Sequence, residues 1–309
     1  MESVTTEPST TSNPSTTRVP PHAFFVVSAI FHYLGPAFAV LLFGAVAPLG
    51  VAWLRIATAA AIFAAWRRPW RLIAEQNWSQ RRLLLAFGLV LGVMNGCFYL
   101  AIDRLPLGTV GAIEFFGSIV LAAIGVRTRR NIVSLLLAIG GVWLLTDARL
   151  AGQPLGFIFA FANCALFMLY VILGHRIARD GGDSGIDRLG AAMLVALIVI
   201  SPVGLAGAVT AFGHPEFLLV GIGVGVCSSV VPYICDQLAM ARLSRATFAL
   251  LLALLPACAT IIGVLVLRQI PSSAELTGVA LIVIGVAIHR EGDTDHVDST
   301  GIATPIEPG

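Results

Sequence analysis

Long apolar runs separated by short polar segments dominate the chain between residues 23 and 290. A membrane-spanning helix needs about 20 largely apolar residues. Ten runs approach that length, and the fifth is the shortest. They cover residues 23–43, 47–66, 83–103, 106–125, 131–146, 153–174, 189–211, 217–240, 246–267 and 273–290. The pattern predicts an all-α integral membrane protein with ten transmembrane helices.

The arginines test this count, because cytoplasmic loops of membrane proteins hold an excess of basic residues. With the N-terminus inside, fifteen of the nineteen arginines fall in predicted inside segments and three in predicted outside loops. The three are Arg104, Arg149 and Arg268, while Arg55 lies within a span. A miscounted span would scramble this alternation downstream. We therefore predict a multi-pass protein with both termini in the cytoplasm.

Polar tails flank the apolar region. Residues 1–22 are rich in Ser, Thr and Pro, and residues 291–309 are acidic and polar, which is typical of disordered segments. Signal-peptide cleavage is the alternative for the N-terminus, since residues 45–47 (AVA) resemble a cleavage site. The first apolar run is nevertheless long enough to span, so we expect two disordered tails around the helices.

A weak internal similarity divides the helical region into two halves. Residues 99–105 (YLAIDRL) and 237–243 (QLAMARL) share Leu-Ala and Arg-Leu at an offset of 138 residues. Chance is the alternative, because Leu and Ala are common here. We expect one five-helix repeat over 23–150 and a second over 151–290. Since five is odd, the two repeats have opposite orientations, an architecture used by secondary transporters.

The composition narrows the class further. Charged residues make up only 12% of the chain and hydrophobic ones 57%, whereas a soluble domain is about 25% charged. No Lys occurs, so neither a Walker A loop nor a Schiff-base site can form. The five cysteines match no zinc or redox motif. We expect no cofactor, no metal and no nucleic-acid partner, although the net charge of +2 by itself says nothing about nucleic acid.

Several polar side chains are predicted to share one depth in the membrane. Arg55, Asn95 and Glu114 each lie 8 residues from the outer end of their span. At 1.5 Å per residue this is about 12 Å below the outer boundary, near the middle of the hydrocarbon core. Three further residues fall at similar depth, namely His32, Tyr33 and Asn163. Because intramembrane polar groups are costly, such a layer indicates a functional site.

Two interpretations of Arg55 and Glu114 stay open. They can form a buried ion pair that fixes helix packing. Alternatively, Arg55 binds the carboxylate of an amino-acid solute through its guanidinium fork, and Glu114 binds the ammonium group or exchanges a proton. Both can hold in different states of one transport cycle.

The other candidates also have structural alternatives. Asn95 and Asn163 can bind the solute or serve as hydrogen bonds between helices. His32 can relay protons or simply pack against its neighbours. Tyr99 and Tyr170 can line the site or anchor their helices at the membrane interface.

Two features lie in the second half. Asp236 is a candidate binding residue, or forms a surface ion pair with Arg242 and Arg245. Pro256 is expected to break the ninth span, as a hinge or as a kink that lines the solute path.

Glycines at spacing four, Gly88, Gly92 and Gly96, permit close approach of another helix. Packing within the chain and dimerisation explain them equally well. We therefore predict no oligomeric state.

The motifs resemble those of the EamA-type transporters of the drug/metabolite transporter superfamily, most closely the threonine/homoserine exporter group. The resemblance covers roughly residues 25–290. The matching stretches are Leu54-Arg55 with Pro69-Trp70-Arg71-Leu72, Gly92-Val93-Met94-Asn95 with Phe98-Tyr99-Leu100, Leu105-Pro106-Leu107-Gly108 with Glu114-Phe115, Gly174 with Arg176, and Val231-Pro232-Tyr233 with Arg242-Leu243. The resemblance implies ten spans in two repeats, proton-driven export, and an acidic residue at the place of Asp236.

Three positions depart from the family pattern. Leu255 precedes Pro256 where the family often has Glu, Ser118 stands where Pro is frequent, and Arg268-Gln269 replaces the usual Gly-Glu. These departures bear on the substrate more than on the fold.

We expect a secondary active transporter of the bacterial inner membrane that exports small amino-acid-like metabolites by alternating access around a midplane site. Its partners are then a small-molecule solute, protons and the lipid bilayer. An exporter of drugs or other metabolites on the same fold is the alternative. An intramembrane zinc protease would need a His-Glu pair, which the chain lacks, and a scaffold would not need midplane charges.

Overall fold

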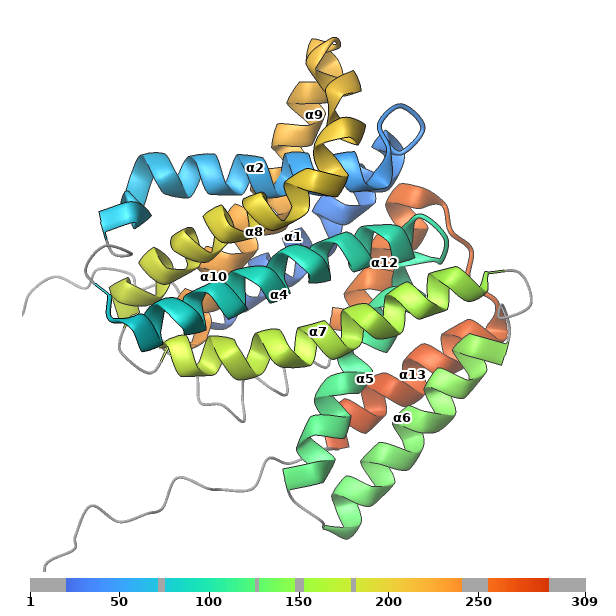
Figure 1. Ribbon diagram of the computed structural model, residues 1–309. Coiled ribbons are helices and arrows are strands. Elements are labelled where there is room, and N and C mark those ends of the chain that lie inside the picture. Colours follow the sequence, from blue (N-terminus) through green and yellow to red (C-terminus); the bar gives the residue numbers. More distant parts are fainter. Residues whose placement is uncertain are drawn as a thin grey trace, which may run out of the picture.

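The protein is seen in a computed structural model that describes residues 21–71, 76–125, 128–147, 153–178, 182–240 and 255–288. The regular structure of these residues is entirely helical (Figure 1). The helices are α1 (Pro21–Leu42), α2 (Pro48–Arg67), α4 (Trp78–Ile102), α5 (Leu107–Gly125), α6 (Arg129–Asp147), α7 (Pro154–Ala178), α8 (Gly182–Phe212), α9 (Pro215–Gly225), a π-helical turn η1 (Val226–Val230), α10 (Val231–Met240), α12 (Leu255–Leu267) and α13 (Ser273–Ile288).

Each predicted span is helical over most of its described residues. The predicted eighth span consists of α9, η1 and α10 in succession. Among the described residues, six helices are long and apolar enough to cross a membrane, and α5, α12 and α13 contribute shorter apolar stretches. The all-α membrane class is therefore confirmed, while the number of ten spans stays a prediction.

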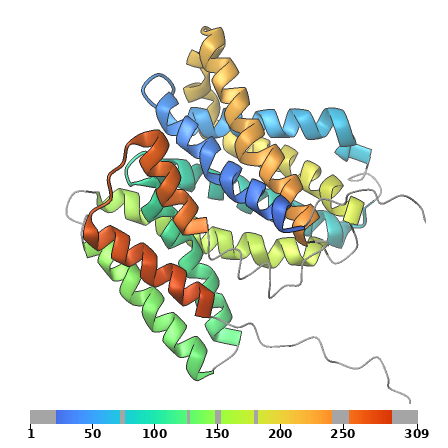
Figure 2. The same cartoon turned by 180° about the vertical axis from the view of Figure 1, so that it is seen from behind.

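The helices pack in defined pairs. α2 lies against α8, and α6 lies against α13. α4 packs on α7 and α8, α1 on α10 and α12, and α5 on α12 and α7. Both views show α6 and α13 side by side at one end of the molecule, next to α5 (Figures 1 and 2). Each of these pairs joins a helix from the first half of the chain to a helix from the second half.

The glycines at spacing four lie on the face of α4 that contacts α8. A Cβ atom at Gly92 would approach the backbone oxygen of Ala196 to 3.0 Å, and one at Gly88 would come within 2.5 Å of the Val195 side chain. Gly96 faces Ile200 on the same helix. Packing within the chain therefore explains all three.

Basic side chains at the predicted inner ends stabilise helix termini. Arg130 Nε donates to the backbone oxygen of Ile288 at the end of α13 over 2.5 Å. Arg67 at the end of α2 forms an ion pair with Asp187 on α8, with 2.6 Å between Nε and Oδ1. Arg130 thus joins α6 to the last described residue of α13, and Arg67 joins α2 to α8.

Candidate functional site

Arg55 lies on α2 in the interior of the bundle, and only 5% of it is exposed. Its Nε donates to Ser229 Oγ and its Nη2 to the backbone oxygen of Ser228, both over 2.8 Å. Its guanidinium carbon sits 5.7 Å from the centre of the Tyr99 ring on α4. The cation is thus held by neutral oxygens and an aromatic face.

The local sequence explains why the Ser228 oxygen is available. In an α-helix that oxygen would accept the N–H of residue 232, but Pro232 has none. The backbone is also wound as a π-turn over Val226–Val230, where Val231 N donates to Val226 O. Such turns disturb the regular hydrogen-bond ladder and are frequent at functional sites. Pro232 and the π-turn therefore present a backbone acceptor to Arg55.

Close approach of α1 completes this corner. A Cβ atom at Gly35 would lie 2.0 Å from Ser228 Oγ and 2.8 Å from Ser228 N. No residue other than glycine fits there without displacing the π-turn. Gly35 thus fixes α1 against the segment that holds Arg55.

Glu114 on α5 is 3% exposed, and its Oε1 accepts a hydrogen bond from Asn163 Nδ2 on α7 over 3.2 Å. Its Oε2 is buried and has no hydrogen-bond partner. The two residues come from different predicted repeats, so a single hydrogen bond here joins the halves of the chain. One carboxylate oxygen remains free to bind a cation or a proton.

Arg55 and Glu114 do not form an ion pair in the described structure. No salt bridge within 4.0 Å joins them, and the polar contacts of Arg55 are those to the two serines. In this conformation the two charges are apart, so it is not the buried ion pair of the first interpretation above.

Buried polar atoms without partners gather around these residues. Each lies on a different element, and all are excluded from solvent. They are Tyr33 Oη, Tyr99 Oη, Ser228 Oγ, Glu114 Oε2 and Asn163 Oδ1. An unsatisfied buried polar atom costs about 1–3 kcal/mol, so a group of five calls for an explanation. We refer to Arg55, Glu114, Asn163 and these tyrosine and serine groups as the polar centre.

The remaining midplane candidates have local partners. Asn95 Nδ2 donates to Leu91 O on its own helix over 2.8 Å, and the Tyr233 hydroxyl lies beside the Asn95 amide. The His32 ring meets the Tyr33 ring edge-on at 5.2 Å. Asn95 is buried and His32 is half-buried.

The two predicted tyrosines lie inside the bundle. Tyr99 is fully buried, and its hydroxyl approaches Arg55 and Ser228 without a hydrogen bond of good geometry. Tyr170 stacks on Phe87, with 5.1 Å between ring centres. Tyr99 therefore does not act as an interfacial anchor in this structure.

Asp236 at the predicted inner end of α10 accepts a hydrogen bond from Ser28 Oγ on α1 over 2.5 Å. The arginines proposed as its alternative partners, residues 242 and 245, lie outside the described residues. Pro256 lies in α12, next to its first described residue. The preceding part of the predicted ninth span, residues 246–254, is also outside the described residues, so the hinge stays a prediction.

Three serines of the site were missed by sequence reasoning: Ser28, Ser228 and Ser229. A single serine in an apolar run carries little signal, because its hydroxyl is often satisfied by its own helix. Two of the three could have been indicated by a pattern, the pair Ser228-Ser229 with Pro232 four residues after the first serine in an apolar span.

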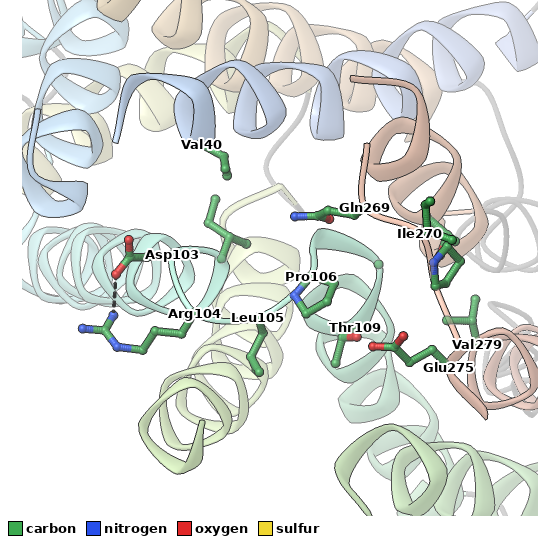
Figure 3. A pocket seen from close by; sticks show the side chains of 14 residues that line it. Val40, Asp103, Arg104, Leu105, Pro106, Thr109, Gln269, Ile270, Glu275 and Val279 are labelled. Carbon is green, nitrogen blue, oxygen red and sulfur yellow. Dashed lines mark ion pairs between the residues drawn. The ribbon is translucent and has the colours of Figure 1, made fainter. Parts of the chain in front are cut away.

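A cavity of about 370 Å³ lies at the predicted outer end of the bundle rather than at the polar centre (Figure 3). It opens between the α4–α5 connection and the α12–α13 connection, with α1 alongside. We call it the outer pocket. Its lining includes Val40, Asp103, Arg104, Thr109, Gln269 and Glu275.

Gln269 links the two sides of this pocket. Its Oε1 accepts the backbone N–H of Leu107 at the start of α5 over 3.0 Å. Asp103 and Arg104 form an ion pair at the rim, with 3.1 Å between Oδ2 and Nη1. The side chains of Thr109 and Glu275 point toward one another across the pocket (Figure 3).

An apolar helical bundle that buries an arginine, a carboxylate and unsatisfied polar atoms at its centre is typical of membrane transporters. Comparison with known proteins agrees. A family model, the EamA-like transporter family, matches residues 154–289. The chain is 31% identical over 275 residues to the threonine/homoserine exporter RhtA of Salmonella typhimurium (strain LT2), covering 85% of this chain and 90% of that protein.

It is also 32% identical over 261 residues to the protein of the same name in Escherichia coli (strain K12), covering 82% of this chain and 84% of the relative. The chain therefore belongs to the EamA-like transporter family, and it is a transporter rather than an enzyme. A solved crystal structure with 18% identity shares the fold, with a TM-score of 0.61 over 87% of this chain and 98% of that one.

Proposed function

We propose that this protein is a proton-coupled secondary exporter of threonine, homoserine or similar small amino acids, working by alternating access around the polar centre. The names of the relatives support the solute class, because they are threonine/homoserine exporters. One observation carries the proposal: Arg55 is a buried cation without a carboxylate partner in the described structure.

The partners of Arg55 suit exchange for a solute. Ser229 Oγ and Ser228 O are neutral acceptors, whereas a carboxylate carries the opposite charge and can accept two parallel N–H···O bonds from the guanidinium. The carboxylate thus adds charge attraction and bidentate geometry to the hydrogen bonds that the serines provide. The carboxylate of an amino acid would therefore displace the serines, and the serines would hold Arg55 in place when the solute has left.

Glu114 and Asn163 supply the opposite end of the site. The free Oε2 of Glu114 and the free Oδ1 of Asn163 are both acceptors, as an ammonium group requires. When no solute is bound, a proton on Glu114 would lower the cost of burying this carboxylate. Solute and proton would then compete for one group, which is the minimum that coupling requires.

The helix pairings support two inverted repeats. If each helix of the first predicted repeat is exchanged with its counterpart in the second, the α4–α7 contact becomes the α10–α1 contact, and the α1–α12 contact becomes the α7–α5 contact. The pairs α2–α8, α5–α12 and α6–α13 map onto themselves. Such exchange is what a pseudo-two-fold axis between two halves would produce.

We further propose ten spans in the bacterial inner membrane with both termini in the cytoplasm. The arginine distribution supports this orientation. The match of the family model to residues 154–289 supports a second repeat within 151–290.

Reconstituted vesicles test the function directly. Labelled threonine and homoserine uptake is measured with and without an imposed proton gradient. We expect gradient-dependent uptake by the unaltered protein, and loss of at least 90% of it in Glu114→Gln and Arg55→Gln. Two matched controls change the same residue types at exposed positions, Glu216→Gln and Arg82→Gln, and should keep most of the activity.

Folded yield in the membrane separates loss of function from loss of structure. Unchanged uptake in Glu114→Gln would refute the assignment of that residue. If no amino acid moved but a dye or an antibiotic did, the drug-exporter alternative would replace the amino-acid proposal.

A further inference from the structure

We propose that Tyr33 closes the path between Glu114 and the outer pocket, and that the outer pocket is the release vestibule for an amino-acid zwitterion. This inference rests on the proposed export function. Three observations carry it: the position of the pocket above Glu114, the fit of Tyr33 against Gly111, and the polar groups of the pocket.

Helix α5 connects the outer pocket to the polar centre. Gly108 lines the pocket, Gly111 follows one turn deeper, and Glu114 one turn deeper again. Six residues span about 9 Å of helix, and each step of three residues changes the direction by about 60°, so Gly111 lies between the directions of Gly108 and Glu114. The carboxylate of Glu114 is therefore less than two turns below the pocket floor, and Gly111 leaves the surface of α5 between them without a side chain.

Tyr33 occupies the space beside that bare surface. A Cβ atom at Gly111 would lie 2.9 Å from Tyr33 Oη, so the tyrosine hydroxyl rests directly on the Gly111 backbone. The ring is fully buried, and Glu114 is within electrostatic reach of the hydroxyl. Val40, which lines the pocket, is seven residues after Tyr33 on α1 and hence on the same face. Tyr33 thus stands between the pocket and the carboxylate on both helices.

The tyrosine hydroxyl is held in this position without a hydrogen bond. A buried hydroxyl without a partner costs about 1–3 kcal/mol, which a rotated or solvated tyrosine would recover. A solute with acceptor and donor groups could supply the missing partner. The closed position of Tyr33 is therefore one that an arriving polar solute can disturb.

The outer pocket is suited to a departing zwitterion. Arg104 and Asp103 place both charge signs at its rim, and both are partly exposed. Thr109 adds a hydroxyl to the lining. A volume of about 370 Å³ falls in the range of about 300–1,000 Å³ that small-molecule sites occupy. The pocket also lies between the two predicted halves, where a path must open during alternating access.

Thiol reactivity tests the closure without any solute. Cys164 is a native reporter below the gate, because a Cβ at Gly117, one turn deeper than Glu114, would lie 2.7 Å from its Sγ. The other four cysteines are replaced by Ala, and a membrane-impermeant thiol reagent is added from outside. We expect Cys164 to react slowly in this background and at least tenfold faster in Tyr33→Ala. Phe38→Ala, an aromatic truncation on the exposed side of the same helix, should leave the rate unchanged.

Pro106→Cys, added in the same background with Cys164 also replaced, reports on the pocket itself, because Pro106 lines the pocket and is half-buried. It should react readily whether or not Tyr33 is present. Equal Cys164 rates in Tyr33→Ala and Phe38→Ala, together with a reactive Pro106→Cys, would refute the gate. An unreactive Pro106→Cys would refute the vestibule.

A flux measurement gives the second test. In vesicles loaded with threonine, Tyr33→Ala should leak threonine down its gradient but fail to concentrate it, whereas Tyr33→Phe should still concentrate it. If Tyr33→Ala concentrates threonine as well as Phe38→Ala does, the gate is refuted while the export function stands. Absence of threonine movement in the unaltered protein would instead refute the export function, and the thiol test would still judge the gate.

Discussion

Arg55 on α2 donates a hydrogen bond to the backbone oxygen of Ser228, which Pro232 leaves without its helical donor. A proline on one helix therefore creates the acceptor that holds a cation on another. This relationship gives the family-like stretch Val231-Pro232-Tyr233 a physical role. It also means that the position of Arg55 can be altered without touching Arg55.

Pro232→Ala should lower transport while preserving the fold. Alanine restores an N–H that competes with Arg55 for the Ser228 oxygen, a hydrogen bond worth about 1 kcal/mol net, so transport should fall roughly fivefold. Removal of an interior proline should leave stability unchanged or raise it. Vesicle uptake and the apparent melting temperature in detergent measure the two effects. Pro202→Ala, at an exposed interior position of α8, serves as the control. A parallel fall of activity and folded yield would contradict the interpretation.

Gly35→Ala should destabilise the protein. The new methyl group would sit 2.0 Å from Ser228 Oγ and 2.8 Å from Ser228 N, and a backbone atom cannot move aside easily. Overpacking of this kind costs about 1–3 kcal/mol. Thermal unfolding in detergent should show a lower midpoint than that of Gly223→Ala, whose added Cβ meets nothing within 4 Å. Equal midpoints would mean that α1 moves away at little cost.

The parts of this structure that repeat along the chain could be predicted from the sequence. Apolar runs predicted the helices, because each must face lipid or another apolar helix over its whole length. Distance from the span ends predicted that Glu114 and Asn163 lie at similar depth, and the two side chains are hydrogen-bonded.

The lateral arrangement could not be predicted in the same way. Depth does not reveal which helices are neighbours. The sequence therefore suggests Glu114 as a partner of Arg55, whereas its partners in the structure are Ser228 and Ser229. The π-turn has no pattern in the apolar sequence, and the small side chains that it presents carry little signal. The outer pocket is built by two connections far apart in sequence, and only the packing of α5 on α12 brings them together.

Ser28→Ala should weaken the contact between α1 and α10 near the predicted inner end. The Ser28 hydroxyl donates to Asp236 Oδ1, and its loss would leave a half-buried carboxylate with one partner fewer. A hydrogen bond to a charged group contributes about 1.5–3 kcal/mol. A double-mutant cycle with Asp236→Asn, followed by thermal unfolding, should give a coupling of about 1 kcal/mol. Additive effects would show that the two side chains do not interact in the membrane.

Arg268→Gly should stabilise the protein. Arg268 follows the last residue of α12 with a φ of 54°, and its N–H donates to Val264 O over 3.1 Å. This is the left-handed position after a helix that glycine usually takes, and a residue with a Cβ pays about 1–2 kcal/mol there. Glycine also loses more entropy on folding, so we expect a net gain in the free energy of unfolding of about 0.5–1 kcal/mol.

Arg68→Gly removes the same strain after α2, where φ is 48°, and its effect should add to that of Arg268→Gly because the two sites lie at opposite ends of the bundle. Melting of the two single variants and the double variant in detergent measures this. A lower midpoint for Arg268→Gly would show instead that the arginine side chain contributes more than its backbone costs.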